Sequence, residues 1–246
     1  MFNYNFLLYI LSPFIILKLL VYSYKNSIEK SYLSEKLFGH KNITKKSIWL
    51  HAASLGEMKI AINICQHLID KGHKDILLTS NTPSSKNIFE KSNLNDIQHF
   101  YLPFDFYFVM KKFVNKISAN ILIIIETEIW PNLYDLCNKN NTKIIIINAR
   151  FNPPNGLLRL LSQRIYKQTL SYVDHIYCKS KKDKESYMKY VNEEDITETG
   201  NIKHALVDEN LDAENLINRK YVLLASSHHR EEIIIIKEWL KLKSNK

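Results

Sequence analysis

The sequence predicts an α/β fold of the doubly wound kind, with a parallel sheet. Seven short runs of β-forming residues alternate with amphipathic stretches long enough to be crossover helices. The runs Ile121–Ile125 and Ile144–Ile147 are continuously apolar, as expected for parallel strands covered by helices on both faces. Gly72, Gly156 and Gly200 fall at breaks between these elements. In such folds ligands bind beyond the carboxyl ends of the strands, so we expect function there.

The composition fits a globular chain with an anionic partner. Of the 246 residues, 46% are hydrophobic and 24% are charged, which allows a packed core. The formal net charge of +9 favours phosphate-bearing lipid or nucleic acid as a partner, although a Lys-rich composition gives the same charge without a binding role. Cys65, Cys137 and Cys178 lie far apart without metal-ligand spacing, so we expect buried free thiols in a reducing compartment.

Residues 1–24 are predicted to anchor the chain in a membrane. The stretch from Phe6 to Tyr22 is almost wholly apolar, which is marginal for a full span of about 20 residues. No small-residue cleavage site of the signal-peptide kind follows it. A basic flank comes next, formed by Lys25, Lys30, Lys36, Lys41, Lys45 and Lys46. By the positive-inside rule this flank stays cytoplasmic, where it would meet the anionic surface of the inner leaflet. A helix lying in the interface and a buried core helix are the alternatives.

Residues 25–218 form the predicted Rossmann-like domain. Its strands are expected at Ile48–Ala53, Asp75–Ser80, Gln98–Leu102, Asn120–Ile125, Thr142–Asn148, His175–Cys178 and Ile196–Thr199. The helices between them include Met58–Asp70, Phe106–Ile117 and Leu157–Tyr172, and another is expected to begin at Trp130-Pro131.

The first strand leads into a tight turn at Ser54-Leu55-Gly56 and a helix that opens at Glu57. The dipole and free N–H groups at a helix start favour a carboxylate there and are expected to lower its pKa. An ionised Glu57 could accept a proton or hold a cation. Gly56 allows a ligand to approach the backbone closely. The alternative is that Glu57 is a helix-start residue and nothing more.

Polar residues follow five other strands. After the second strand, the hydroxyls and amides of Thr79–Ser85, Thr82 among them, could bind an anion. The fourth strand runs straight into Glu126 and Glu128, two carboxylates that are costly there unless paired, hydrated or used. The fifth strand is followed by Asn148 and Arg150, the seventh by Lys203, and a later strand by His228 and His229.

Structural roles are open for each of these residues. Glu126 could pair with Arg150 in a salt bridge at the rim, and Asn148 could cap a turn. Lys203 could be solvated. His51, inside an apolar strand, fits a hydrogen-bonded core histidine better than a ligand.

Together these strings resemble the Kdo transferases, which add 3-deoxy-D-manno-octulosonic acid (Kdo) to the lipid A precursor of lipopolysaccharide. The matching strings are HAASLGE (51–57), TSNTPSS (79–85), YLPFD (101–105), ETEIWPN (126–132), NAR (148–150), TGNIK (199–203) and ASSHHREE (225–232). They occur in the family's order, and the resemblance covers essentially the whole chain.

The resemblance implies a glycosyltransferase of the GT-B type that is inverting, metal-independent and free of cofactors, with CMP-Kdo as donor. By this similarity Glu57 matches the general base, and Glu126 and Lys203 match residues that stabilise the transition state. The residues expected to bind substrate are Ser54, Gly56, Thr82, Glu128, Asn148, Arg150 and His228. The N-terminal domain would bind the lipid A precursor at the inner membrane.

Two departures from the family pattern stand out. Ser85 occupies the position of a glycine in the family's second-strand turn, which would crowd an anion there. Residues 219–246, with a strand at Tyr221–Ala225 and a helix at Glu231–Leu242, resemble only the beginning of the CMP-Kdo-binding domain. We therefore expect a C-terminally truncated chain that is inactive by itself.

A rival reading is a membrane-tethered module that binds anionic lipid without transferase activity. It needs the basic flank and the acceptor site but not Glu57. A nucleic-acid-binding role is disfavoured, because the sequence has no recognition helix, RNP-like aromatic pair or zinc motif, and its positive charge is spread.

Overall fold

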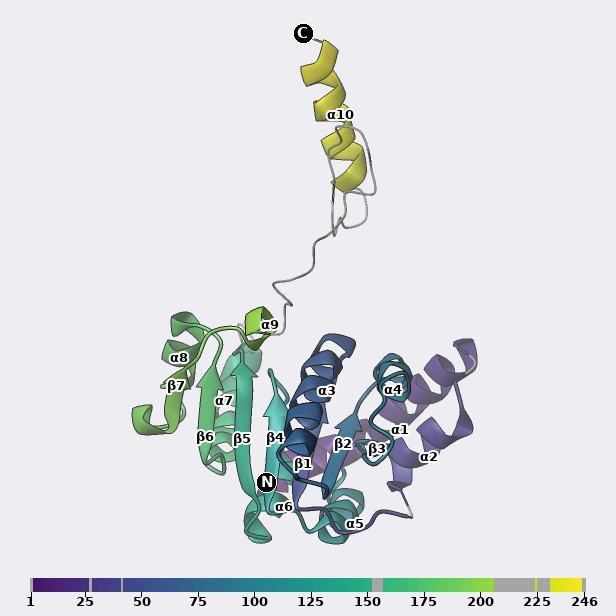
Figure 1. The fold of residues 1–246 in the computed structure, drawn as a ribbon, viewed down its shortest axis with the longest axis vertical. Coiled ribbons are helices and arrows are strands. Elements are labelled where there is room, and N and C mark those ends of the chain that lie inside the picture. The colour runs from purple at the N-terminus through teal and green to yellow at the C-terminus, as the bar shows by residue number, and fades with distance from the viewer. Residues whose placement is uncertain are drawn as a thin grey trace. The chain divides into compact units, whose positions relative to one another are not determined.

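The computed structural model describes residues 2–26, 28–40, 42–151, 157–205, 224 and 231–244. The chain divides into two compact units, residues 1–207 and 208–246. In the second unit the described helix is α10 (Glu231–Ser244), which confirms the predicted helix at Glu231–Leu242 (Figure 1). The strand predicted at Tyr221–Ala225 lies outside the described residues, apart from Leu224.

The first unit contains a seven-stranded parallel sheet in the order β3-β2-β1-β4-β5-β6-β7. Its strands are β1 (Ile48–Ala52), β2 (Ile76–Ser80), β3 (Gln98–Tyr101), β4 (Ile121–Ile125), β5 (Lys143–Ala149), β6 (His175–Cys178) and β7 (Ile196–Glu198). Each lies within one residue of its predicted limits. The doubly wound α/β fold is confirmed.

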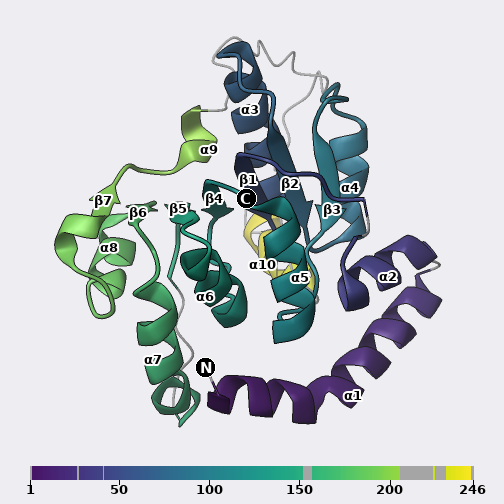
Figure 2. The same cartoon turned by 90° about the horizontal axis from the view of Figure 1, so that it is seen from below.

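Helices cover both faces of this sheet (Figures 1 and 2). On one face lie α3 (Leu55–Asp70) and α4 (Pro83–Glu90), and on the other lie α5 (Tyr107–Ile117), α6 (Pro131–Lys139) and α7 (Leu157–Leu170). The shorter elements are α2 (Lys30–Phe38), α8 (Lys181–Tyr187), the 3₁₀ turn Glu193–Asp195 and α9 (Ile202–Ala205). Two faces covered by helices explain why the strands are apolar runs rather than alternating patterns.

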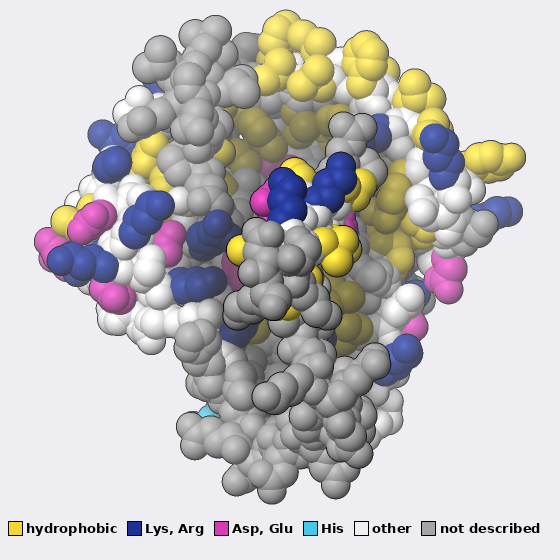
Figure 3. Space-filling model, turned by 90° about the horizontal axis from the view of Figure 1, so that it is seen from above, with side chains coloured by type: hydrophobic (Ala, Val, Ile, Leu, Met, Phe, Trp, Pro, Cys, Tyr) yellow, Lys and Arg dark blue, Asp and Glu magenta, His cyan; other side chains and the backbone are white. Residues whose placement is uncertain are grey.

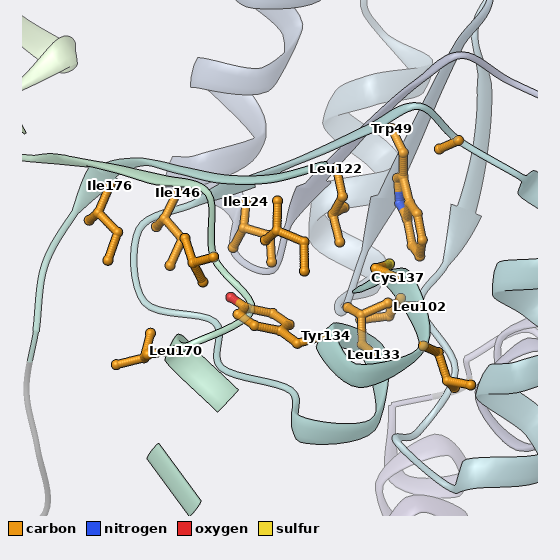
Figure 4. Packing of buried hydrophobic residues seen from close by; sticks show 14 of the residues in the cluster. Trp49, Leu102, Leu122, Ile124, Leu133, Tyr134, Cys137, Ile146, Leu170 and Ile176 are labelled. Carbon is orange, nitrogen blue, oxygen red and sulfur yellow. The ribbon is translucent and has the colours of Figure 1, made fainter. Parts of the chain in front are cut away.

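The larger core cluster lies between the sheet and the α5–α6–α7 layer. Figure 4 shows Leu122, Ile124, Ile146 and Ile176, from three neighbouring strands, packed over Tyr134 and other side chains of α6. The Tyr134 hydroxyl donates a 2.6 Å hydrogen bond to the Glu128 carbonyl, so this core also fixes the loop that follows β4. The three cysteines are buried free thiols, as predicted.

The N-terminal helix α1 (Phe2–Lys25) lies outside the α5–α6 layer and touches the domain near both of its ends (Figure 2). Near its start, the Tyr4 hydroxyl donates to Asp105 Oδ2 at 2.9 Å, and the side chains of Asn5 and Asn132 are hydrogen-bonded. Near its end, Leu19 is buried in a small cluster with residues of α2 and β3. From Tyr4 to Lys25 the helix is long and apolar enough to cross a membrane, with a mean hydropathy of 2.0.

One prediction for the basic flank is wrong. Lys36 does not face solvent or lipid, because only 5% of it is exposed. Its Nζ donates to the Asn81 side-chain oxygen at 2.7 Å and to the Leu102 carbonyl at 2.8 Å. Glu35 is also used structurally, since its carboxylate accepts the Tyr101 amide at 2.8 Å. Helix α2 is therefore part of the domain and supports the ends of β2 and β3.

Candidate active site at the carboxyl edge of the sheet

The candidate site lies where the strand order reverses. The chain runs from β1 to β2 and β3 in one direction, then returns to β4 on the other side of β1. Loops after β1 and β4 leave the sheet at this point in opposite directions, which makes it the expected ligand crevice of an open parallel sheet. Glu57 follows β1, and Glu126 and Glu128 follow β4, so the topology brings the three carboxylates to one place.

Glu57 belongs to a hydrogen-bonded cap at the start of α3. The Ser54 hydroxyl donates to Glu57 Oε1 at 2.8 Å, and its oxygen accepts the Glu57 amide at 3.4 Å. Glu57 Oε2 accepts the Ala53 amide at 2.7 Å. This reciprocal pattern is a form of the capping box, so α3 begins two residues before the predicted opening at Glu57.

The predicted lowering of the Glu57 pKa is wrong. Burial raises the pKa of this carboxyl, and the charge of Glu126 raises it further. The hydrogen bonds from Ser54 and Ala53 act in the opposite direction but do not outweigh burial. A helix start lowers the pKa of a solvated carboxyl group, but the Glu57 side chain is buried, and burial has the larger effect.

Glu126 is held by two side chains from other elements. Its Oε1 accepts Lys203 Nζ at 2.8 Å and Asn148 Nδ2 at 3.3 Å. Asn148 Oδ1 also accepts the Ile202 amide at 3.1 Å, so the same buried side chain fixes the start of α9, which carries Lys203. Glu126 and Asn148 both have left-handed backbone, with φ of 65° and 50°. Such strain in non-glycine residues typically marks functional sites.

Lys203 connects this pair to the turn after β1. Its Nζ lies 3.7 Å from the point that a Cβ on Gly56 would occupy. The ammonium of α9 therefore stands over the first turn of α3, one residue from Glu57. Arg150 is exposed, and Lys203 rather than Arg150 is the ion-pair partner of Glu126 in the part of the chain described.

Glu128 is held through one carboxylate oxygen. Its Oε2 accepts the Trp130 indole N–H at 2.9 Å and Asn81 Nδ2 at 3.3 Å. Burial raises the pKa of Glu128 to about 7, and the charge of Glu57 adds to this rise. Burial likewise lowers the pKa of Lys36, which bonds the other end of the Asn81 amide, to about 7. A half-buried carboxyl group and a buried amino group thus share the Asn81 amide.

His51 lies beneath this network and is only partly satisfied. Its Nδ1 is 2.9 Å from Thr79 Oγ1, which also accepts the Trp49 indole N–H at 2.8 Å. Its buried Nε2 has no hydrogen-bond partner in the described residues and lies 4.0 Å from Glu128 Oε2. Burial lowers the pKa of His51 to about 3, so the ring is neutral.

The sequence model of the family described as "3-Deoxy-D-manno-octulosonic-acid transferase (kdotransferase)" matches residues 31–206. These residues make up more than half of the chain and contain every site residue described above. The chain belongs to this family. The recognition of Kdo transferase strings in the sequence is confirmed.

Curated members of the family show how much of a relative this chain covers. It is 28% identical to a 3-deoxy-D-manno-octulosonic acid transferase of Haemophilus influenzae, over 96% of this chain and 58% of the relative. It is 30% identical to such a transferase of Rickettsia felis, over 77% and 42%. A bifunctional glycosyltransferase/methyltransferase of Fusobacterium nucleatum is 27% identical, over 80% and 33%. The chain thus spans about a third to three fifths of the relatives' lengths.

Not every residue expected at this Kdo transferase family site is part of the cluster. Thr82 is the N-cap of α4, and its hydroxyl accepts the Ser85 amide at 3.3 Å and contacts Ser85 Oγ at 2.7 Å. That amide is therefore occupied within the turn, where an anion had been expected. His228 lies outside the described residues.

Sequence reasoning missed Lys36 and Asn81 at this site. Lys36 was assigned to the basic flank, and Asn81 was not separated from the polar turn after β2. A signal for Asn81 was its position directly after a buried strand next to β1. Lys36 gave no signal, because a lysine that becomes buried through packing of a separate helix looks like any other lysine.

Proposed function

We propose that this chain forms the acceptor-binding part of an inverting glycosyltransferase that moves Kdo from CMP-Kdo to the lipid A precursor. The proposed acceptor hydroxyl attacks the anomeric carbon of Kdo, the bond from that carbon to the phosphate oxygen breaks, and CMP leaves. Glu57 takes the hydroxyl proton as general base. The reaction is proposed to need no metal and no cofactor, in a GT-B arrangement whose second domain binds CMP-Kdo.

The observation that carries this proposal is the convergence of Glu57, Glu126 and Lys203 at the switch point of the sheet. A general base works best with a pKa near the working pH, and burial moves the pKa of Glu57 in that direction. Lys203 is proposed to stabilise the negative charge that develops on the leaving phosphate. Glu126 holds that ammonium and carries the charge needed beside an oxocarbenium-like centre.

Substrate contacts are proposed for the groups around this triad. Ser54 and Gly56 form the turn beside Glu57, Glu128 presents a second carboxylate, and Asn148 orients Glu126 and α9. Thr82, Arg150 and His228 are proposed as more distant substrate-binding residues on family similarity alone. We place the protein on the cytoplasmic face of the inner membrane, with α1 as its anchor.

One observation favours the rival function, a lipid-binding module without transferase activity. Both carboxylate oxygens of Glu57 already accept hydrogen bonds in the helix cap. If capping α3 were the whole role of Glu57, Glu57 would not act as a general base, as the rival function requires.

Glu57→Gln separates these two functions. Capping boxes accept Glu or Gln at this position, so the variant keeps the start of α3 and its stability. It cannot take up a proton, so we expect a loss of transfer of about 10²-fold or more. The assay is CMP-Kdo-dependent transfer of labelled Kdo to lipid A precursor, in membranes that contain the protein as the cell produces it.

The outcomes divide clearly. Active wild type with inactive, normally folded Glu57→Gln supports the proposed function. Full activity in Glu57→Gln would remove Glu57 as the base. Wild-type protein that binds the precursor in vesicles but never transfers Kdo would favour the rival function.

A further inference from the structure

A groove of about 430 Å³ runs between α1 and the loops that follow β3 and β4. Leu8, Ile15 and Leu19 of α1 form one wall, and Phe104 and Trp130 form the other. Nearly all of the lining surface is apolar. The volume is within the range of about 300–1,000 Å³ typical of sites for small ligands.

The polar groups along this groove are few and mostly occupied. Asp105 accepts the amides of Asn132 and Leu133, at 2.8 and 2.9 Å, and the Tyr4 hydroxyl, so its carboxylate is used within the fold. Lys18 is an exposed cation at the groove. The groove therefore suits an apolar chain with a negatively charged group near one end.

The inner wall of the groove is shared with the candidate active site. Trp130 lines the groove, and its indole N–H binds Glu128. Phe104 also lines it, and its ring lies 5.4 Å from Lys36 Nζ, which binds Asn81 beside Glu128. A molecule with its chain in the groove would have its head group beside the carboxylates.

The outer face of α1 is apolar as well. Phe14 is 69% exposed and Leu7 is 53% exposed. In Figure 3 hydrophobic side chains form an arc along one border of the molecule, over α1, and apolar surface continues into the hollow inside the arc. A helix with such a face lies against lipid, so the groove would open beside the acyl region of a membrane.

We propose that this groove binds one fatty acyl chain of the glycolipid acceptor and so holds its sugar beside Glu57 and Glu128. This inference rests on the proposed function and adds to it a subsite for the lipid chain. The occupant of the groove is an acyl chain of the acceptor, and not an acyl chain of the bulk phospholipid. The buried chain would make recognition depend on acyl length, by roughly fourfold in affinity per methylene removed from water.

The test uses a photoreactive lipid in vesicles with the full chain. The probe is a diacylated glucosamine 1-phosphate with a diazirine in its acyl chain, and the matched probe is phosphatidylglycerol with the same acyl chain. After irradiation, peptide mass spectrometry locates the adducts. We expect the glycolipid to label the Leu8–Leu19 and Phe104–Trp130 walls several times more than the phospholipid does.

Paired substitutions on α1 supply the control. Ile15→Trp fills the groove. Phe14→Trp introduces the same side chain at the preceding residue, which lies on the outer face of α1. At roughly fourfold per methylene, displacement of about two methylenes should reduce groove labelling about fifteenfold in Ile15→Trp. Labelling in Phe14→Trp should stay unchanged. Both variants keep an apolar helix, so a general loss of membrane binding would affect them equally.

Two results would overturn the inference. Equal labelling of the groove by both probes would make it a general lipid contact, and adducts confined to the outer face would leave the groove without a chain. Failure of Kdo transfer in the separate assay would remove the proposed function, whereas the labelling pattern would still decide whether the groove holds a glycolipid chain.

Discussion

Glu128 is a site residue whose protonation is coupled to the stability of the fold. Burial raises its pKa from the model-compound value of 4.5 to about 7 in the folded chain. Between these two values the folded state binds more protons than the unfolded state. The contribution of Glu128 to the free energy of unfolding therefore falls as pH rises from about 4.5 to about 7.

Glu128→Gln should remove this pH dependence. The Gln amide oxygen still accepts from Trp130 and Asn81, so the hydrogen bonds are retained. Urea unfolding in detergent, followed from pH 4.5 to 7, should show a wild-type free energy that declines relative to that of the variant. Parallel curves for the two proteins would show that Glu128 is solvated and titrates normally.

Lys203 offers a test of chemistry against stability. Its ion pair with Glu126 is partly exposed, so loss of the pair should change the free energy of unfolding by about 1 kcal/mol or less. Lys203→Met should nevertheless reduce Kdo transfer by about 10²-fold, because it removes the cation that we propose stabilises the leaving phosphate. Thermal melting and the transfer assay measure the two effects separately.

A matched variant is Lys139→Met, which breaks the 2.7 Å pair with Asp135 on α6. This pair is also partly exposed, and Lys139 Nζ lies 5.9 Å from the centroid of the Tyr107 ring on α5. It should give a similarly small change in melting with full transfer. Equal activity of the two variants would make Lys203 a structural lysine.

The site shows which residues sequence reasoning can find. Glu57, Glu126 and Lys203 were found because each lies in the loop or first helical turn after a strand, and parallel strands deliver such residues to one edge. Their catalytic roles were expected from the resemblance to the family. The pairing of Glu126 with Lys203 rather than Arg150 was not predicted, because it depends on α9 folding back through Asn148. Lys36 and the raised pKa of Glu57 depend on burial, which the local sequence does not encode.

At the level of elements, the cap of α3 combines two roles. The Ser54 side-chain oxygen caps the start of α3 by accepting the Glu57 amide. The Ser54 hydroxyl also donates a hydrogen bond to the Glu57 carboxylate. Ser54→Ala should lower the free energy of unfolding by about 1 kcal/mol through loss of the N-cap. It should also reduce transfer, because the carboxylate of Glu57 loses one of its two fixed hydrogen bonds.

Ser180→Ala is the comparison for this prediction. Ser180 caps α8 with the same geometry, and its oxygen accepts the Asp183 amide at 3.3 Å. Its loss should cost a similar free energy of unfolding, measured by urea titration, without an effect on transfer. A transfer defect as large in Ser180→Ala as in Ser54→Ala would trace both defects to stability.

Strands were predicted more closely than the short helices, for a physical reason. β4 and β5 are covered by helices on both faces, with one face buried and the other mostly half-buried, and this covering is visible as unbroken isoleucine runs. Helix α2 has nine residues, and its buried members Tyr32 and Lys36 form no apolar stripe that the sequence displays. It is held by contacts with β3 and its loop, such as Glu35 with the Tyr101 amide.

At the scale of the whole first unit, the sheet, the site and α1 form one sequence of contacts. β4 places Glu128, Glu128 holds Trp130, and Trp130 lines the groove that α1 closes. Helix α1 is thus a wall of the proposed acceptor site. The sequence predicted an apolar anchor, but its length left a spanning helix and an interfacial helix equally open.

The contacts of α1 favour the interfacial arrangement. Tyr4 and Asn5 near its start bind Asp105 and Asn132, and Leu19 near its end packs against α2 and β3. A helix that crossed the bilayer would have to break one set of these contacts. We therefore predict that both ends of α1 stay on the side of the membrane that carries the sheet, with Phe14 and its neighbours in the acyl boundary.

An epitope tag before Met1 and the substitution Asn26→Cys report the two ends. The native cysteines are buried, so an impermeant maleimide labels the introduced thiol selectively. In inverted inner-membrane vesicles the tag should be accessible to protease, and the thiol of the Asn26→Cys variant should be accessible to maleimide. Protection of the tag with labelling at 26 would establish a spanning α1, and the groove would then have to form from a different wall.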